Sequence, residues 1–222
     1  MSTRDNTNPL PAAPAQAPVL DRVRAAALNE LRARASAAPP SWRRQATGVA
    51  LTVLATTALV IELGSLLSIV DLNRLGRRAL PVTLLLALQV AGIWLAIAPG
   101  RRLARFGAGL LAAAAAAAVV GWRGAGAGDA AMNTPFACSF SHLAVDVIPL
   151  IIVLYGLRRF AWTPGRAVLA GAAAGATGAI AGELACVRGW GHVLVHHVGA
   201  ALLVTLVCVV ISRARTPSSF AP

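Results

Sequence analysis

Cysteine, histidine and carboxylate side chains recur at helical spacing in the C-terminal half of the chain. Cys138, His142 and Asp146 follow one another every four residues, which places all three on one face of a helix. Two further groups, spaced three and four residues apart, come later in the chain. They are Glu183 with Cys186, and His192 with His196, beside which His197 lies. If the helices that carry them are neighbours, these side chains converge at one end of a bundle.

Three roles fit these residues. The first is a zinc or copper site, because imidazole, thiolate and carboxylate groups are ligands of these ions. Its candidate ligands are His142, Asp146, Glu183, His192 and His196. The second is a disulfide or redox-sensing pair formed by Cys138 and Cys186, which suits an oxidising compartment such as the periplasm. The third is ordinary packing, in which His142 pairs with Asp146. The sequence has no CxxC or HExxH spacing that would decide among them.

The segments that carry these residues are apolar and long. Hydrophobic residues make up 57% of the chain and charged residues 13%, about half the usual share of soluble proteins, and the mean hydropathy is +0.70. Six stretches approach the roughly 20 residues that a helix needs to cross a bilayer. They are Thr47–Val70, Leu80–Ala98, Leu103–Gly121, Phe136–Leu157, Gly165–Ala185 and Gly191–Ser212. The predicted fold is all-α: a polytopic membrane protein with six transmembrane helices over residues 47–212.

Arginine positions predict the orientation of these helices. All 20 basic residues are Arg, and 15 of them fall on the cytoplasmic side if both termini are cytoplasmic. This orientation, in the bacterial inner membrane, places the Cys and His groups at the outer end of the bundle. The net charge of +12 then reflects contact with lipid rather than with nucleic acid, because the arginines flank apolar segments.

Three carboxyl groups lie inside the apolar stretches, where a charge is costly and needs a partner. They are Glu62, Asp146 and Glu183. For Glu62, an arginine of the cluster Arg74, Arg77 and Arg78 is within reach; a protonated, hydrogen-bonded carboxyl is the alternative.

The parts outside the membrane are short. Residues 1–46 are predicted to form a cytoplasmic tail, and residues 213–222 a second, shorter one. Within the first, residues 1–18 are proline-rich and predicted to be disordered, whereas residues 19–37 are predicted to be helical and to end before two consecutive prolines. The cytoplasmic loops are too short for a catalytic domain. The sequence has no Walker, GxSxG or dinucleotide-binding motif, so we predict that the protein is not an enzyme.

The helix predicted over residues 19–37 is amphipathic. Its apolar stripe consists of Leu20, Val23, Leu28 and Leu31, and its arginines lie mostly off that stripe. A basic amphipathic helix next to a membrane either lies on anionic lipid or docks into a groove of a cytoplasmic partner.

The last three apolar stretches resemble a bacterial family of six-helix inner-membrane anti-sigma factors, which includes the negative regulators of sigma F type. The resemblance extends from Phe136-x-Cys138 through Ile148-Pro149 and Leu157-Arg158-Arg159-Phe160. It continues through Gly171–Gly182, Glu183-Leu184-Ala185-Cys186, His192 and His197-Val198-Gly199-Ala200. The first three stretches match the family only in hydropathy and number, and the N-terminal tail is longer than is usual in the family.

The resemblance implies a membrane-bound inhibitor that sequesters an extracytoplasmic-function sigma factor and releases it on a signal. The partner of the Leu20/Val23/Leu28/Leu31 stripe would then be that sigma factor. A myxobacterial branch of the family implies light or oxidative stress as the signal and carotenoid synthesis as the output. Two alternatives stay open from the residues alone: a small transporter with a proton relay, and a sensor that binds a metal ion or a haem.

Overall fold

The computed structural model describes residues 21–29, 41–99, 102–122, 135–160 and 162–214. The chain divides into two compact units, residues 1–39 and residues 40–222. In the first unit, residues 21–29 are helical and every described side chain is exposed. This helix lies within the predicted range of 19–37. The other residues of that range, the segment predicted to be disordered (1–18) and the end of the chain (215–222) lie outside the described residues.

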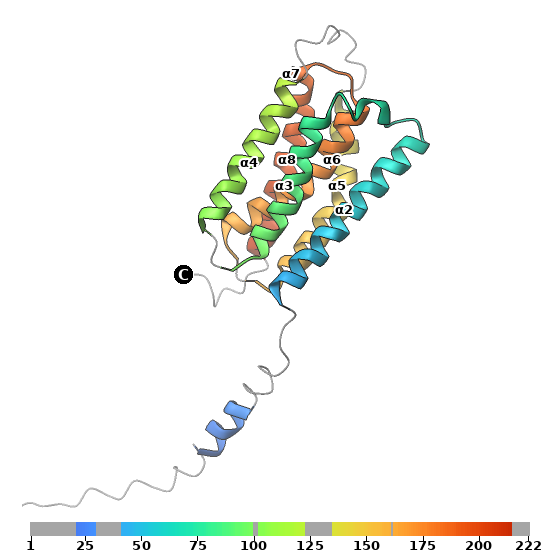
Figure 1. Ribbon diagram of the computed structural model, residues 1–222. Helices are drawn as coiled ribbons and strands as arrows, with labels where there is room; N and C mark the ends of the chain where they lie inside the picture. The colour runs from blue at the N-terminus through green and yellow to red at the C-terminus, as the bar shows by residue number, and fades with distance from the viewer. Residues whose placement is uncertain (1–20, 30–40, 100–101, 123–134, 161, 215–222) are drawn as a thin grey trace, which may run out of the picture. The chain divides into compact units, whose positions relative to one another are not determined.

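The second unit is a bundle in which every described regular element is helical. The elements in order are α2 (Trp42–Leu66), η1 (Leu72–Arg74), α3 (Ala79–Ile97), α4 (Arg102–Gly121), α5 (Pro135–Leu157), α6 (Pro164–Ala185), α7 (Trp190–Val193), η2 (Leu194–Val198) and α8 (Gly199–Ala214). Successive long helices run in opposite directions, and α7, η2 and α8 form one continuous rod (Figure 1).

Five of the described helices are long and apolar enough to cross a membrane. They correspond to five of the six predicted stretches. The remaining stretch, Leu103–Gly121, forms α4, and the part of this helix whose side chains are described, Arg105–Gly121, is apolar but shorter than a full span. The first span starts at Trp42, before the predicted Thr47, because the Ser41 hydroxyl caps the helix by accepting a hydrogen bond from the backbone N of Arg44 (3.4 Å). Together these features establish a helical membrane protein.

The α6 helix lies at the centre of the bundle, between α3, α5 and α8 (Figure 1). Its span is 83% buried within the protein, against 17–50% for the other four. Small residues explain this position, because they allow helix backbones to approach closely. A Cβ atom added at Gly171 would lie 2.6 Å from the Cα atom of Thr205, and one at Gly175 would lie 3.0 Å from the Cα atom of Ala201. The glycines of α6 therefore set its contact with α8.

A buried hydrogen-bonded group joins α2, α3 and α6. The side-chain amide of Gln89 donates to the hydroxyl oxygens of Thr57 (3.0 Å) and Thr177 (2.8 Å), and the two hydroxyls lie 3.0 Å apart. All three side chains are fully buried. Such bonds between helices contribute about 0.6–2 kcal/mol each in a membrane and fix which helices are neighbours.

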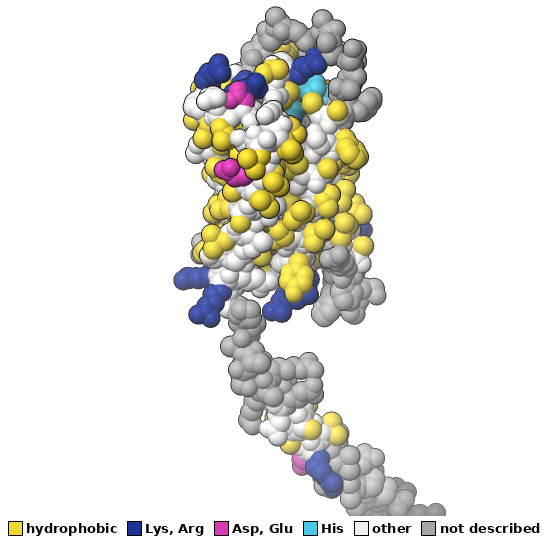
Figure 2. All heavy atoms as spheres, turned by 90° about the vertical axis from the view of Figure 1, so that its right-hand side faces the viewer, with side chains coloured by type: hydrophobic (Ala, Val, Ile, Leu, Met, Phe, Trp, Pro, Cys, Tyr) yellow, Lys and Arg dark blue, Asp and Glu magenta, His cyan; other side chains and the backbone are white. Residues whose placement is uncertain are grey.

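The surface of the bundle has the character of a membrane protein. One face shows a continuous hydrophobic zone between two ends where arginines gather (Figure 2). Large aliphatic side chains are exposed on several helices, among them Leu59, Ile151 and Leu206. An exposed apolar surface of this extent fits a lipid environment and not water.

Candidate functional site

One end of the bundle brings together the start of α5, the end of α6 and the α7–η2 segment. Most of the residues predicted to do chemistry lie here, on these three elements. The structure separates the predicted residues into four groups: three in which side chains pair or cluster, and Glu62 by itself on α2.

The first group contains two cysteines and two histidines. Cys138 comes from α5, Cys186 caps the C-terminus of α6, His192 lies on α7 and His197 on η2. One ligand atom from each side chain lies within 4.8 Å of the other three. Neither cysteine forms a disulfide in this structure, so the pair has the reduced form of the redox alternative. Cys186, a predicted redox residue, thus shares a cluster with two imidazoles.

The helix type explains why His197, and not the predicted His196, joins this group. The prediction used the regular α-helical period, in which residues four apart share a face. The structure has a π-helical turn at Leu194–Val198, where the backbone N–H of Gly199 donates to the carbonyl oxygen of Leu194, five residues earlier. This wider turn brings His197, five residues after His192, into the group. His196 instead forms a hydrogen bond between its Nδ1 atom and the Ser139 hydroxyl (2.8 Å).

His142 and Asp146 form the second group, on successive turns of α5. The Nε2 atom of His142 lies 3.2 Å from a carboxylate oxygen of Asp146, and both side chains are almost fully buried. The other carboxylate oxygen accepts a hydrogen bond from the backbone N of Gly178 (2.7 Å). The His142 ring occupies the space that a Cβ atom at position 178 would need, which explains why this residue is glycine. This couple is the pairing predicted as ordinary packing, and neither residue is in the four-residue group.

The third group pairs Glu183 with an arginine of the loop after α2. The guanidinium Nε of Arg78 lies 3.9 Å from a carboxylate oxygen of Glu183, which is buried. Arg74 is occupied by Asp71, at 3.0 Å, and by the carbonyl oxygen of Ala185. Burial raises the pKa of Asp71, but hydrogen bonds from Asn73 and Arg74 outweigh it and lower the pKa overall.

Glu62 forms the fourth group by itself. It is exposed on α2, in the last turns of the helix, and has no ion pair within the described part of the chain. Arg78 and Arg74 therefore lie beside Glu183 and Asp71 and not beside Glu62. The reason is that the η1 loop folds over the end of α6, where the backbone N–H of Asp71 donates a hydrogen bond to the carbonyl oxygen of Leu184 (3.2 Å).

A haem would need two axial imidazoles, and the candidate pairs in the sequence are His142 with His196 and His142 with His197. The ring centroids of His142 and His197 lie 5.7 Å apart in an edge-to-face arrangement, so these two rings touch each other. A porphyrin between them would require α5 and η2 to separate.

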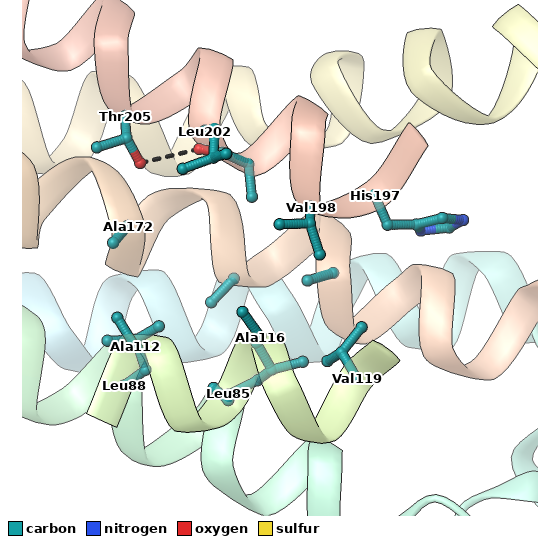
Figure 3. A pocket seen from close by; sticks show the side chains of 14 residues that line it. Leu85, Leu88, Ala112, Ala116, Val119, Ala172, His197, Val198, Leu202 and Thr205 are labelled. Carbon is teal, nitrogen blue, oxygen red and sulfur yellow. Dashed lines mark hydrogen bonds between the residues drawn. The ribbon is translucent and has the colours of Figure 1, made fainter. Parts of the chain in front are cut away.

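An apolar cavity of about 100 Å³ lies next to the cluster. Its lining comes from α3, α4, α6 and the η2–α8 segment, and includes Leu85, Leu88, Ala112, Val119 and Leu202. Figure 3 shows His197 at one end of the cavity, with its ring directed away from the aliphatic side chains. The sequence analysis did not find this cavity, because its lining consists of common apolar residues from four separate segments.

Comparison with known proteins gives a relative for the whole chain. The chain is 40% identical over 207 residues to the carotenogenesis protein CarR of Myxococcus xanthus, and the match covers 91% of this chain and 90% of CarR. The chain belongs to the CarR family. No family model matches it, and no solved structure matches it.

The match to CarR extends over more of the chain than the family resemblance in the sequence, which covers well only the last three apolar stretches. About a tenth of the chain lies outside the match, which is about 20 residues counted over the two ends together. The region aligned with CarR therefore contains the cluster between Cys138 and His197. It also contains the helical segment with Val23 and Leu28.

Proposed function

We propose that this protein is an anti-sigma factor of the bacterial inner membrane that regulates carotenoid synthesis and has no enzymatic activity. Its N-terminal segment holds an extracytoplasmic-function sigma factor, and a signal at the membrane releases it. The observation that supports this most is the 40% identity to a carotenogenesis protein over nine-tenths of both chains. We take light or oxidative stress as the signal, in line with the family resemblance.

The N-terminal helix is suited to partner binding. Val23 is 62% exposed and Leu28 is 44% exposed, so the described residues of their own unit do not cover these side chains. Apolar side chains that their own unit leaves exposed are available for a groove in another protein. We assign the role of sigma-factor binding to Val23 and Leu28, and to Leu20 and Leu31, which lie outside the described residues.

The signal would act at the opposite end of the bundle. There Cys138 and Cys186 form no disulfide and lie close to two imidazoles, so they are the candidate sensing residues. Thiols react with oxidants and with soft metal ions when they are accessible. Both cysteines are partly exposed, unlike Cys208, which is buried in α8.

Co-purification tests the proposed function. The full-length protein, solubilised in mild detergent, should bind an extracytoplasmic-function sigma factor of its own cell. Removing residues 1–39 should abolish this binding while the bundle stays in the membrane, because those residues form a separate compact unit. A sigma factor that still binds the truncated protein would place the binding surface elsewhere.

Reporter fusions test the proposed topology of six spans with both termini in the cytoplasm. In the bundle, α4 runs beside α3 in the opposite direction, so we include α4 as a span although its apolar part is short (Figure 1). Reporters fused after Arg44 and after Ser212 should be active in the cytoplasm, and one inserted at Asp129 should be active in the periplasm. A cytoplasmic reporter at Asp129 would show that α4 does not cross the membrane.

A further inference from the structure

We propose that Cys138, Cys186, His192 and His197 bind one Zn²⁺ ion. Their four ligand atoms already lie within 4.8 Å of one another. In a tetrahedral zinc site, ligand atoms at bonds of about 2.0–2.3 Å are separated by roughly 3.3–3.8 Å. Closing the cluster around an ion therefore needs movements of about 1 Å in side chains, without rearrangement of the helices. Two thiolates and two imidazoles form one of the common structural zinc sets.

Charge balance favours zinc at this depth. Both thiols lose their protons when they bind the metal, and two thiolates neutralise the two positive charges of Zn²⁺ while the imidazoles stay neutral. The occupied site thus has no net charge. This matters at the end of a membrane bundle, where an uncompensated charge is costly.

The backbone holds the four ligands from three directions. Cys138 lies on α5, and Cys186 follows directly after α6, where its backbone N donates to the carbonyl oxygen of Gly182 (2.9 Å). His192 and His197 come from α7 and η2, and the π-helical turn places both side chains on the same side of this segment. A metal ion here joins α5, α6 and the α7–η2 segment. These are elements that the chain otherwise connects through loops.

A glycine makes room for one of the ligands. The His197 ring occupies the space where a Cβ atom of Gly182 would lie, and its Nδ1 atom is the nearest one. Any side chain at position 182 would therefore push the imidazole out of the cluster. The glycine is explained by the position of His197 rather than by a turn, since it lies inside a regular helix.

Neighbouring polar groups orient the ligands. The His142 ring contacts the His197 ring edge to face, with centroids 5.7 Å apart, and Asp146 fixes His142 in turn. The His196 ring lies 4.6 Å from that of His192 and is held by the Ser139 hydroxyl. Groups that orient metal ligands in this way commonly change metal affinity about 10–100-fold when they are lost. His142, Asp146 and His196 are thus positioning residues rather than ligands.

Metal analysis of the purified full-length protein tests the site. We expect one zinc ion per chain after purification without chelator. Co²⁺ should replace it and give the visible absorption bands of a tetrahedral ion together with a thiolate-to-cobalt charge-transfer band. This readout needs no mutant and no sigma factor, so its failure is distinct from a failure of the proposed function, which the inference extends.

Variants then assign the ligands. Cys138→Ser, Cys186→Ser, His192→Ala and His197→Ala should each weaken zinc binding by about 100-fold or more, because each removes a bond to the ion, and the cysteine variants should also reduce the charge-transfer band. Cys208→Ser is the matched thiol control and should retain zinc fully. His196→Ala removes a positioning residue but no bond to the ion, so it should weaken zinc binding only about tenfold, clearly less than any of the four ligand variants.

A pair of glycine variants tests the geometry without removing a ligand. Gly182→Ala should weaken zinc binding about tenfold by displacing the His197 ring. Gly191→Ala, in the same outer region and with no atom within 4 Å of the added Cβ, should have no effect.

Three outcomes would overturn the proposal. One is a wild-type protein that contains no zinc and gives no cobalt spectrum at micromolar metal. Another is a Cys138–Cys186 disulfide in the purified protein, seen as the loss of two titratable thiols. The third is a metal site that survives His197→Ala but is lost in His196→Ala. That result would make His196 the ligand, as regular helical spacing predicts.

Discussion

Replacing Val23 and Leu28 by aspartate should release the sigma factor and induce its target genes without any signal. Both side chains are apolar and exposed in the isolated protein, at 62% and 44%. In a complex they would be buried in a groove, where an unpaired charge costs several kcal/mol. Two such charges should weaken sigma-factor binding on the order of 100-fold or more. A transcriptional reporter and co-purification with the full-length protein measure the two effects.

A charge-matched variant separates docking from electrostatics. Ala25→Asp with Asn29→Asp adds the same two negative charges to the same helix but outside the stripe: Asn29 lies nearly opposite the stripe, and Ala25 lies beside its edge. It should repress normally. Because all four positions are exposed, neither double variant should reduce the amount of protein in the membrane. Equal derepression by both would show that the stripe is not the binding surface and that the net charge of the helix determines sigma-factor binding.

The second large effect is expected at the centre of the bundle. Gly171→Ala should destabilise the protein by about 1–3 kcal/mol, because the added methyl group would overlap the backbone of α8. The new Cβ atom would lie 2.6 Å from the Cα atom of Thr205 and 2.9 Å from the Cβ atom of Cys208. Neither neighbour can rotate away, so α6 and α8 must separate. Unfolding in a series of detergent mixtures with increasing sodium dodecyl sulfate measures the change.

Gly109→Ala is the matched control on α4. It makes the same chemical change, but no atom lies within 4 Å of the added Cβ. Alanine is the better helix former, so this variant should be as stable as the natural protein or up to about 1 kcal/mol more stable. If both variants had the same stability, close packing of α6 on α8 would not be the reason for the glycine at position 171.

The cysteines and histidines at the shared end of α5, α6 and the α7–η2 segment show how far the sequence alone could lead. Spacing placed Cys138, His142 and Asp146 on one face of α5, and the structure confirms that His142 and Asp146 pair there. Spacing also favoured His196 over His197, since it assumed a regular α-helix. The π-helical turn depends on the packing of η2 against α5 and α6, and no residue type marks it reliably.

The ion pairs show the same limit. The sequence placed three arginines within reach of Glu62 and gave a protonated carboxyl as the alternative. In the structure Arg78 lies beside Glu183, and Arg74 pairs with Asp71. Sequence separation does not predict this choice, because the loop after α2 folds over the end of α6, far away in the chain. The buried Gln89 group was missed for a similar reason: Thr57, Gln89 and Thr177 come from three helices.

The sequence by itself determined that this is a helical membrane protein, where most of its spans lie, and which end of the bundle holds the cysteines and histidines. These properties follow from apolar length, arginine positions and helical spacing, all of which are local along the chain. Only the tertiary structure decided that α6 is central, that Glu183 pairs with Arg78, and that His197 joins Cys138, Cys186 and His192. Those outcomes depend on which helices pack together and at what distance, and that is set by contacts between residues far apart in the sequence.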